Sequence, residues 1–468
     1  MNQKNAGKLV EEGGTGSVRD VEVLILGAGA AGLGAASTFL SQGFDQFLVI
    51  EGADHIGGRV HDVEFGGIRL EKGANWLQPI GGPMKKIAEK ADLECQKVEA
   101  EVNQHKLMVM SENGEVIPEW EVEQVITEVC DIMVEAGDFA ANSLNSELTM
   151  RDFMADRYCS DSSSDALRKA VEWYVFDFEY TVPPEQASLD VGHWDRVGSS
   201  GFVIDQRGFK IIFADVVARL VEKRRLLLNR KVISIDHSQI EKVCVTCADG
   251  TVFRADAVLL TFSLGVLQSG LVEFTPPLPH WKTTALNHTP MGAFTKIFLK
   301  FPRKFWDDSE WIMHVSDRRG YYPAFMNMEA QGLFPIGTNI LIAFVVGAEA
   351  QRVENQPLDT TREEIVTVMR GLYGEQQVPS PTDIMLSGWL NDPLQMGAFS
   401  APLPDGAPSK ILHQLQTPVG RIFFGGEATD DKFAGFVIGG MRSGEREAKK
   451  IMRGVLKWEI KRKGFLGK

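Results

Sequence analysis

The residues whose types and spacing point most directly to chemistry are three glycines near the N-terminus, Gly27, Gly29 and Gly32. They follow the apolar run 21–26, and the acidic Glu51 comes 19 positions after the last of them. Glycines at this spacing allow a tight turn, close approach of a pyrophosphate to the backbone, and close packing of a helix on a strand. A carboxylate at position 51 accepts hydrogen bonds from a ribose and repels a 2′-phosphate. The pattern therefore indicates dinucleotide binding and disfavours NADP.

The elements needed to position these residues are also present. Residues 21–26 and 47–50 have the apolar pattern of strands, and residues 30–42 are rich in helix formers, so together they predict a βαβ unit. The N-terminus of its helix offers free N–H groups and a positive dipole to phosphates. Gly58 and Arg59 add a cation near the same phosphates.

A second half of this site is expected near the C-terminus. The strand-like sequence RIFF leads into Gly425, Gly426 and Glu427, and the sequence from 435 to 458 has a helical pattern. This places Glu427 at a strand tip facing a helix N-terminus. A solvated loop glutamate is the alternative interpretation.

The remaining elements follow from hydrophobic periodicity. Residues 84–195 are mostly helical in pattern, whereas residues 230–261 alternate as short strands around the hairpin signal Asp249-Gly250. TKIFLKF and NILIAFVVGAE predict strands of a second sheet, and TREEIVTVMRGLYG predicts a helix that ends at Gly374.

Composition limits the classes of function. A chain of 468 residues exceeds the usual size of one hydrophobic core, which predicts two domains. With 44% hydrophobic residues, 24% charged residues and a mean hydropathy of -0.10, it is typical of soluble globular proteins. A net charge of -14 argues against nucleic acid and anionic membranes as partners and is compatible with a cationic substrate.

Cysteine usage and the N-terminal residues favour a reducing compartment. Residues 1–20 are polar and Gly-rich without an apolar core, so we expect a disordered tail rather than a signal peptide, and a cytoplasmic protein. There are five cysteines. Cys244 and Cys247, in the strand-like CVTC, point to opposite faces of a strand because they are three positions apart. Ordinary strand cysteines are therefore favoured over a metal or redox pair, and no metal site is expected.

Further segments share a pattern with one known family. They are GAGAAGL with Glu51 and GGR, GANW, DQRG at 205–208, LGVLQS at 264–269, TKIFLKFPRKFW at 295–306, RRGYY at 318–322 and GGEAT at 425–429. Taken together, the chain resembles the flavin-dependent amine oxidases, most closely those of the plant polyamine oxidase type, from about Val21 to Met452. The resemblance implies FAD, where the βαβ unit alone allowed NAD or FAD.

The resemblance also implies the fold class and the domains. The fold is α/β, with a Rossmann-like FAD-binding domain built from discontinuous segments, residues 21–95, 200–285 and 386–468. Residues 96–199 and 286–385 form an α+β substrate-binding domain whose mixed sheet is flanked by helices.

The same resemblance assigns cofactor-binding residues. It implies that Glu51 binds the adenosine ribose, that Arg59 and Glu427 lie near the ribityl-phosphate region, and that the backbone of Val232 meets the adenine. The N–H group of Val437 faces the flavin pyrimidine, and Trp76 lies in a loop along the flavin. The other expected cofactor residues are Gly27, Gly29, Ala31, Gly32, Gly58, Gly73, Ala74 and Asn75. No cysteine stands in QMGAFSAP, where covalent members attach their flavin, so non-covalent FAD is expected.

The family reaction implies roles for three further residues. A hydride passes from the carbon beside an amine nitrogen to flavin N5, the imine is hydrolysed, and O2 reoxidises the flavin to give H2O2. Lys296 matches the lysine that holds a water beside N5, and a solvent-facing strand lysine is the alternative. Glu179 matches a carboxylate that binds a distant ammonium. Phe399 matches one of two aromatic rings that sandwich the reacting amine.

Three positions depart from the family pattern and lower the expected polarity of the substrate pocket. Gln78 replaces a second carboxylate, and Phe294 and Phe436 replace tyrosines. A charge-assisted contact of ~1.5–3 kcal/mol falls to ~0.5–1.5 kcal/mol when the acceptor is neutral. We therefore expect an amine that is less polycationic than spermine, or one held mainly by Glu179.

Other functions stay open on the sequence alone. One is a flavin oxidase or desaturase that acts on a less cationic amine, an alkaloid or an amino acid. Another is a flavin-binding scaffold or redox sensor without turnover, because a fold does not define a function. The expected partners are a small-molecule amine and O2, with no nucleic acid and no membrane, and the sequence indicates no particular oligomeric state.

Overall fold

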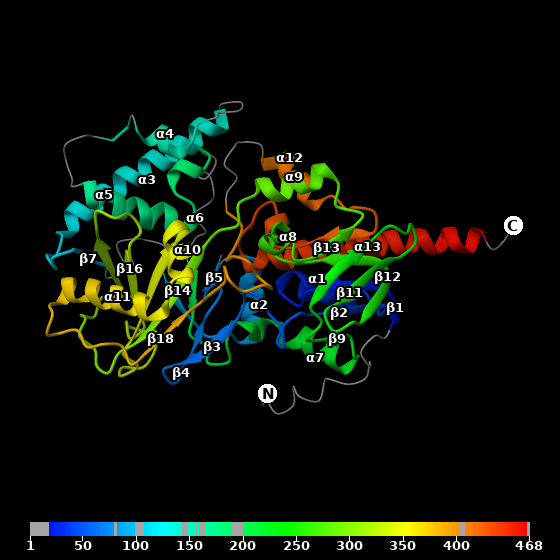
Figure 1. Ribbon diagram of the computed structural model, residues 1–468, viewed down its shortest axis with the longest axis horizontal. Helices are drawn as coiled ribbons and strands as arrows, with labels where there is room; N and C mark the ends of the chain where they lie inside the picture. Colours follow the sequence, from blue (N-terminus) through cyan, green and yellow to red (C-terminus); the bar gives the residue numbers. More distant parts are fainter. Residues whose placement is uncertain are drawn as a thin grey trace.

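The computed structural model describes residues 18–78, 82–98, 107–142, 148–155, 157–158, 165–189, 200–401 and 408–465. In this part of the chain, two large sheets lie side by side with helices packed around them (Figure 1). The expected tail falls on residues 1–17, which lie outside the described residues. Residues 18–20 do not belong to a tail, because they pair with residues 252–254 and start the first strand.

The first sheet contains the expected βαβ unit. Its eight strands, in the order β13-β10-β11-β12-β1-β2-β9 with β19 beside the end of β12, are β13 (Glu273–Thr275), β10 (Val232–Asp236), β11 (Val243–Cys247), β12 (Val252–Leu260), β1 (Val18–Leu26), β2 (Phe47–Ile50), β9 (Leu226–Leu227) and β19 (Ile422–Phe424). Strands β12, β1 and β2 are parallel, and β1 is joined to β2 by α1 (Ala30–Ser41). The meander 230–261 thus returns to the nucleotide-binding sheet, as its last apolar strand predicts.

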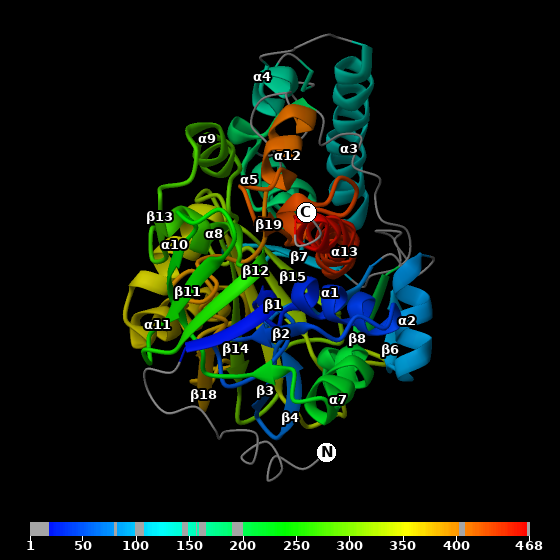
Figure 2. The same ribbon diagram turned by 90° about the vertical axis from the view of Figure 1, so that its right-hand side faces the viewer.

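Helix α13 (Val437–Phe465) crosses α1 with the two backbones in contact, as Figure 2 shows with α13 seen end-on. A Cβ atom on Gly444 would lie 1.9 Å from the carbonyl oxygen of Ala31. Only glycine permits this approach, which brings the first turn of α13 beside the first turn of α1. The N-termini of both helices therefore face the same region.

The second sheet is mixed, as expected for the substrate domain. Its order is β18-β14-β17-β16-β15-β7, and its strands are β18 (Asp383–Leu386), β14 (Phe294–Lys300), β17 (Ile340–Val346), β16 (Ala324–Asn327), β15 (Trp311–Val315) and β7 (Leu107–Ser111). All neighbours are antiparallel except β15 and β7. Residues 84–195, which have a mostly helical pattern, thus also supply strands. One of them is β7, which pairs with residues 204 positions further along the chain.

Two small sheets lie between the large ones. One is the hairpin of β3 (Asp62–Phe65) and β4 (Ile68–Glu71), and the other contains β5 (Trp76–Leu77), β8 (Ser200–Val203) and β6 (Cys95–Val98). Phe65 packs on Phe298 of the second sheet with ring centroids 5.9 Å apart. These segments thus connect the two halves around residues 71–77.

The remaining helices pack around the two sheets (Figures 1 and 2). They are α2 (Pro83–Ala91), α3 (Glu119–Asn142), α4 (Met150–Ala155), α5 (Asp165–Glu172), α6 (Phe178–Tyr180), α7 (Ala214–Glu222), α8 (Leu264–Ser269), α9 (His280–His288), α10 (Gly347–Asn355), α11 (Leu358–Tyr373) and α12 (Pro408–Gln416). Gly374 follows the end of α11, as predicted. Among the described residues, no helix is long and apolar enough to cross a membrane.

Cys244 and Cys247 lie on opposite faces of β11, as their spacing predicts. Cys247 is buried in the core of the first sheet and Cys244 is partly exposed. Burial raises the pKa of the Cys247 thiol to about 12. The two thiols therefore do not converge on one point, which agrees with ordinary strand cysteines.

Candidate active site

One cavity of about 430 Å³ extends from the first βα turn to the second sheet. Of the site residues expected from the sequence, all except Gly32 line it. They are Gly27, Gly29, Ala31, Glu51, Gly58, Arg59, Gly73, Ala74, Asn75, Trp76, Gln78, Glu179, Val232, Phe294, Lys296, Phe399, Glu427, Phe436 and Val437. The fold thus gathers segments from the whole length of the chain around one space.

The first βα turn leaves room for a phosphate group against its backbone. Gly27 has φ +108, and Gly29 is the residue that precedes α1. A Cβ atom on Gly29 would meet nothing closer than 3.8 Å, whereas one on Gly32 would lie 1.9 Å from the Gly27 carbonyl oxygen. Gly29 therefore opens the turn to the cavity, while Gly32 allows the helix to pack on it. Such a turn fits the pyrophosphate of a dinucleotide.

Glu51 connects the ends of β1 and β2. Its two carboxylate oxygens accept hydrogen bonds from the N–H groups of Ala28 at 2.7 Å and Ala53 at 2.9 Å. Burial raises the pKa of Glu51, although these two hydrogen bonds oppose the shift. Because each carboxylate oxygen accepts more than one hydrogen bond, Glu51 can also bind a ribose hydroxyl.

At the opposite wall of the cavity, Glu427 forms hydrogen bonds with residues of three loops. It accepts hydrogen bonds from Arg59 Nη1 at 2.9 Å, from Ser400 Oγ at 2.5 Å and from the N–H group of Gly435 at 2.8 Å. Arg59 Nη1 also donates to the Ala398 carbonyl at 2.8 Å. Glu427 is therefore not a solvated loop residue, because it organises the wall from which Arg59 faces the cavity.

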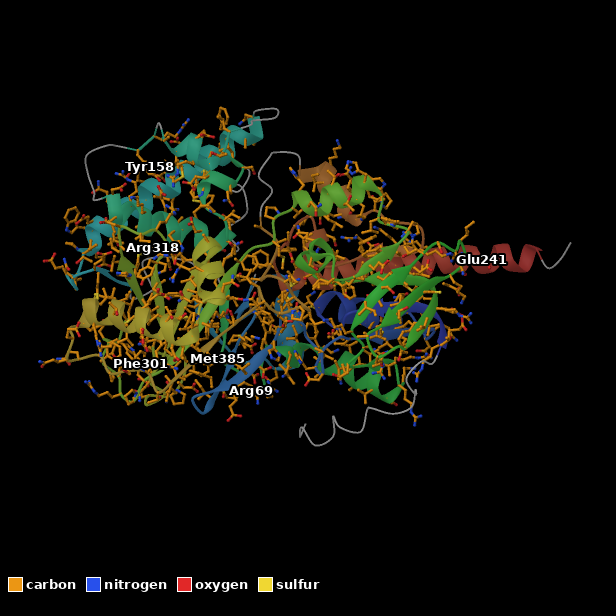
Figure 3. The ribbon with its side chains drawn as sticks, in the orientation of Figure 1. Arg69, Tyr158, Glu241, Phe301, Arg318 and Met385 are labelled. Atoms are coloured by element: carbon orange, nitrogen blue, oxygen red, sulfur yellow. The ribbon has the colours of Figure 1, made fainter. Side chains whose placement is uncertain are left out.

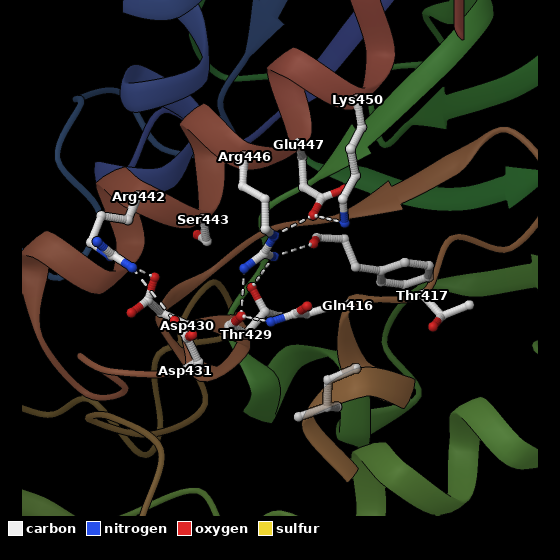
Figure 4. Close-up of polar contacts among 12 residues, drawn as sticks. Gln416, Thr417, Thr429, Asp430, Asp431, Arg442, Ser443, Arg446, Glu447 and Lys450 are labelled. Atoms are coloured by element: carbon white, nitrogen blue, oxygen red, sulfur yellow. Dashed lines mark hydrogen bonds and ion pairs between the residues drawn. The ribbon is translucent and has the colours of Figure 1, made fainter. Parts of the chain in front are cut away.

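The turn that carries Glu427 is itself held by α13, as Figure 4 shows. Arg446 donates to the carbonyl oxygen of Thr429 at 2.6 Å and to its hydroxyl at 2.9 Å, and Arg442 pairs with Asp430 at 3.0 Å. Ser443 Oγ accepts from the Gly426 N–H at 2.9 Å. These contacts position residues 426–430 at the N-terminal end of α13.

Lys296 lies in the middle of the cavity wall on β14 and is 5% exposed. Its Nζ donates to the carbonyl oxygens of Glu71 at 3.0 Å and Gly73 at 2.6 Å, and to Asn75 Oδ1 at 2.8 Å. Burial lowers the pKa of Lys296 to about 7, although the charge of Glu71 opposes this. The ammonium and the free amine are therefore both accessible near neutral pH, and the alternative of a solvent-facing strand lysine is excluded.

The part of the cavity beside the second sheet is aromatic. Phe294 lies 5.9 Å from Phe399 and 5.3 Å from Phe178, and Trp311 lies 5.8 Å from Phe178 and 5.4 Å from Phe344, measured between ring centroids. Of these rings, only Phe294 and Phe399 were expected from the sequence. Trp311 and Phe344 come from β15 and β17, and no local pattern marks them, because only sheet pairing brings them here.

Glu179 follows an irregular helical segment that a buried ion cluster holds in place. Glu172 precedes the π turn Trp173–Asp177, and Asp177 is its last residue. Arg319 pairs with Glu172 at 2.5 Å and with Asp177 at 2.7 Å. Burial raises the pKa of Asp177 to about 6 despite this pairing. The wider turn of a π-helix changes the direction of the side chains that follow it. The cluster therefore determines where Phe178 and Glu179 enter the cavity.

The fold and the cavity together define a dinucleotide-binding protein with a second, aromatic compartment. A family model described as flavin containing amine oxidoreductase matches residues 30–452. The chain is 34% identical to polyamine oxidase 1 from Zea mays over 93% of this chain and 91% of that protein. It is 32% identical to polyamine oxidase 7 from Oryza sativa subsp. japonica over 92% and 94%.

Its fold is similar to a solved structure of a putrescine oxidase variant from a structure-based redesign of cofactor binding. The TM-score is 0.72 at 19% sequence identity, covering 93% of this chain and 100% of the other. The chain therefore belongs to the flavin-containing amine oxidoreductase family. It is an enzyme similar to polyamine oxidases, and small-molecule amines are the substrates of this family.

Proposed function

We propose that this protein oxidises an amine that carries one distal ammonium group, using FAD held non-covalently. When bound, FAD would supply the hydride-accepting flavin and the redox chemistry by which O2 is reduced to H2O2. The amine loses a hydride from the carbon beside its nitrogen, and water hydrolyses the resulting imine to a carbonyl compound and an amine. The observation that carries the proposal is that Lys296 and Glu179 line the same cavity as Gly27 and Gly29.

The chain's own residues have separate tasks in this reaction. The adenosine diphosphate part of FAD would be held by Gly27, Gly29 and Glu51. The ribityl-phosphate region of FAD would be held by Arg59. The aromatic wall excludes water and orients the apolar part of the amine. Lys296 would hold a proton at Nζ beside the reacting atoms and release it when the amine form is needed. No cysteine is found among the described residues that line the cavity, which supports non-covalent binding.

Charge on the substrate side supports a substrate with few positive charges. Glu179 is the carboxylate at the aromatic end, and Gln78 lines the cavity without a charge. The ring faces of Phe178, Trp311 and Phe344 can also attract a cation. An amine with one distal ammonium and an apolar spacer matches this wall better than spermine does.

Anaerobic mixing of the FAD-loaded protein with candidate amines tests the proposal. The panel contains spermine, spermidine, their acetylated forms, simple monoamines and L-amino acids, and flavin absorbance is followed. We expect bleaching by amines with one distal ammonium. Bleaching only by amino acids or uncharged amines would favour a flavin oxidase of a less cationic substrate. If none of them bleaches the flavin, amine oxidation is wrong and a scaffold or redox sensor is favoured.

Glu179→Gln is expected to raise the KM for amines with a distal ammonium by roughly tenfold. The reason is that a charge-assisted contact of ~1.5–3 kcal/mol becomes a neutral one of ~0.5–1.5 kcal/mol. Steady-state kinetics on the bleaching amines measure this, with a monoamine as the internal control because it lacks the second charge.

Gln78→Glu is the matched variant and should act in the opposite direction. A second carboxylate in the cavity is expected to move the preference towards spermine. If the substrate ranking of Gln78→Glu is unchanged, residue 78 does not influence which substrate charge the enzyme prefers.

A further inference from the structure

Two buried carboxyl groups lie directly opposite each other in the β3–β4 hairpin. Asp62 pairs with Glu71 in the antiparallel register, and the two residues are 4% and 7% exposed. Side chains at opposed positions of an antiparallel pair lie on the same face, ~5 Å apart, and like charges there are destabilising. The hairpin therefore favours a state in which one of the two carboxyl groups holds a proton.

Asp62 is the member of this pair that keeps its charge. It accepts a hydrogen bond from Arg69 Nη1, and Lys210 Nζ lies 2.8 Å from its Oδ1. Arg69 is on β4, at the junction between the two halves of the molecule (Figure 3). Burial alone would raise the pKa of Asp62, but the hydrogen bonds from Lys210 and Arg69 hold it below its usual value.

Among the described residues, no cationic side chain donates a hydrogen bond to the Glu71 carboxyl. Its Oε1 accepts from the N–H group of Phe209 at 2.6 Å, whereas its Oε2 is buried without a hydrogen-bond partner among the described residues. An unpaired, buried carboxylate oxygen is costly, and protonation removes that cost. Burial raises the pKa of Glu71 to about 7, and the charge of Asp62 adds to this effect, while Lys296 and Lys210 oppose it.

Glu71 is linked to Lys296 across the cavity wall. The main-chain oxygen of Glu71 accepts one of the three hydrogen bonds from Lys296 Nζ, at 3.0 Å. The Glu71 carboxyl is not among the groups that line the cavity. When it is ionised, its charge raises the pKa of Lys296. The side chain therefore influences Lys296 electrostatically, from behind the wall and without touching the cofactor or the substrate.

We propose that Glu71 is a positioning residue for Lys296. Its buried carboxyl, which lies opposite Asp62 behind the cavity wall, takes up and releases a proton and thereby sets how firmly Lys296 keeps its ammonium charge. The role of Lys296 in this inference rests on the proposed function. The charged groups that face Glu71 are Asp62 on β3, Lys296 on β14 and Lys210 in the 3₁₀ turn Phe209–Phe213.

Infrared difference spectroscopy on the FAD-loaded protein tests the protonation directly, without substrate. Spectra recorded between about pH 5 and about pH 9 bracket the expected transition. We expect a carboxylic-acid C=O band that disappears as the pH rises. The buried Asp177, whose pKa is also raised, contributes a band of its own in every variant. The Glu71 part of the loss should be missing from Glu71→Gln and kept in Glu64→Gln, which makes the same change at an exposed position of the hairpin. A loss of C=O intensity with pH in Glu71→Gln equal to that of the wild type would overturn the proposal.

The pH dependence of amine oxidation then tests the coupling. Glu71→Gln should move the Lys296 transition to lower pH by about one unit or more, because the opposing charge is gone. Asp62→Asn should move it to higher pH, because Glu71 then ionises more easily. If the substitutions only loosened the packing, the Lys296 transition would not move in opposite directions in the two variants. Unshifted profiles in both variants would refute the coupling, and the infrared result stands even if no amine is oxidised.

Discussion

Replacing Lys296 by methionine is expected to reduce kcat for the bleaching amines by roughly 100- to 10,000-fold, the range of a positioned acid–base group. Methionine has a similar length but carries no proton. It also removes the donor that joins the carbonyl oxygens of Glu71 and Gly73 to the side chain of Asn75. Rapid-mixing measurements of flavin reduction and reoxidation, each over a range of pH, would show which step loses its transition near pH 7.

Stability provides a second readout for the same variant. The unfolded chain holds the lysine proton up to about pH 10.4, whereas the folded protein releases it at about pH 7. Between these values the unfolded state binds more protons, so the free energy of unfolding rises with pH. Lys296→Met should show a smaller rise of the free energy of unfolding with pH. Part of the rise should remain, because the pKa of the buried Lys282 is also lowered to about 7.

Lys300→Met is the matched control for both measurements. Lys300 is on the same strand and donates to the carbonyl oxygen of Thr338, away from the cavity. We expect wild-type kcat and pH dependence from this variant. A kcat for Lys296→Met within a few-fold of the wild type would contradict the proposed catalytic role.

Gly32→Ala is expected to weaken FAD binding by roughly 100-fold and to lower the Tm of the apoprotein. The added Cβ atom would lie 1.9 Å from the Gly27 carbonyl oxygen, and backbone cannot rotate away as a flexible side chain does. Overpacking of this kind typically costs up to ~3 kcal/mol. A loss of ~3 kcal/mol in binding free energy corresponds to about two orders of magnitude in affinity. Flavin fluorescence titration and thermal unfolding measure the two effects separately.

Gly29→Ala separates stability from binding at the same turn. Its Cβ atom would have no neighbour closer than 3.8 Å, so the apoprotein should unfold at the wild-type temperature. The methyl group would nevertheless occupy space on the cavity side, and FAD affinity should fall. A Tm for Gly32→Ala equal to that of Gly29→Ala would contradict the distinct roles assigned to the two glycines.

Much of the first sheet could be predicted from the sequence, because its signals are local. β1, α1 and β2 are each encoded by a contiguous pattern, and the glycines and Glu51 lie at their ends. The hairpin at Asp249-Gly250 and the end of α11 at Gly374 are likewise local features. The helical periodicity of residues 84–195 did not show β7, because a short strand is defined by the partner with which it pairs.

The chemical types available to this protein can be identified from the sequence: the glycines of a βα turn, Lys296, Glu179 and the neutral Gln78. Their contacts with one another depend on the tertiary structure. Arg59 meets Glu427 across 368 positions, and Lys296 meets the carbonyl of Glu71 across 225. Burial and neighbouring charges set the protonation of Glu71 and Lys296. Both arise only when distant strands pack together.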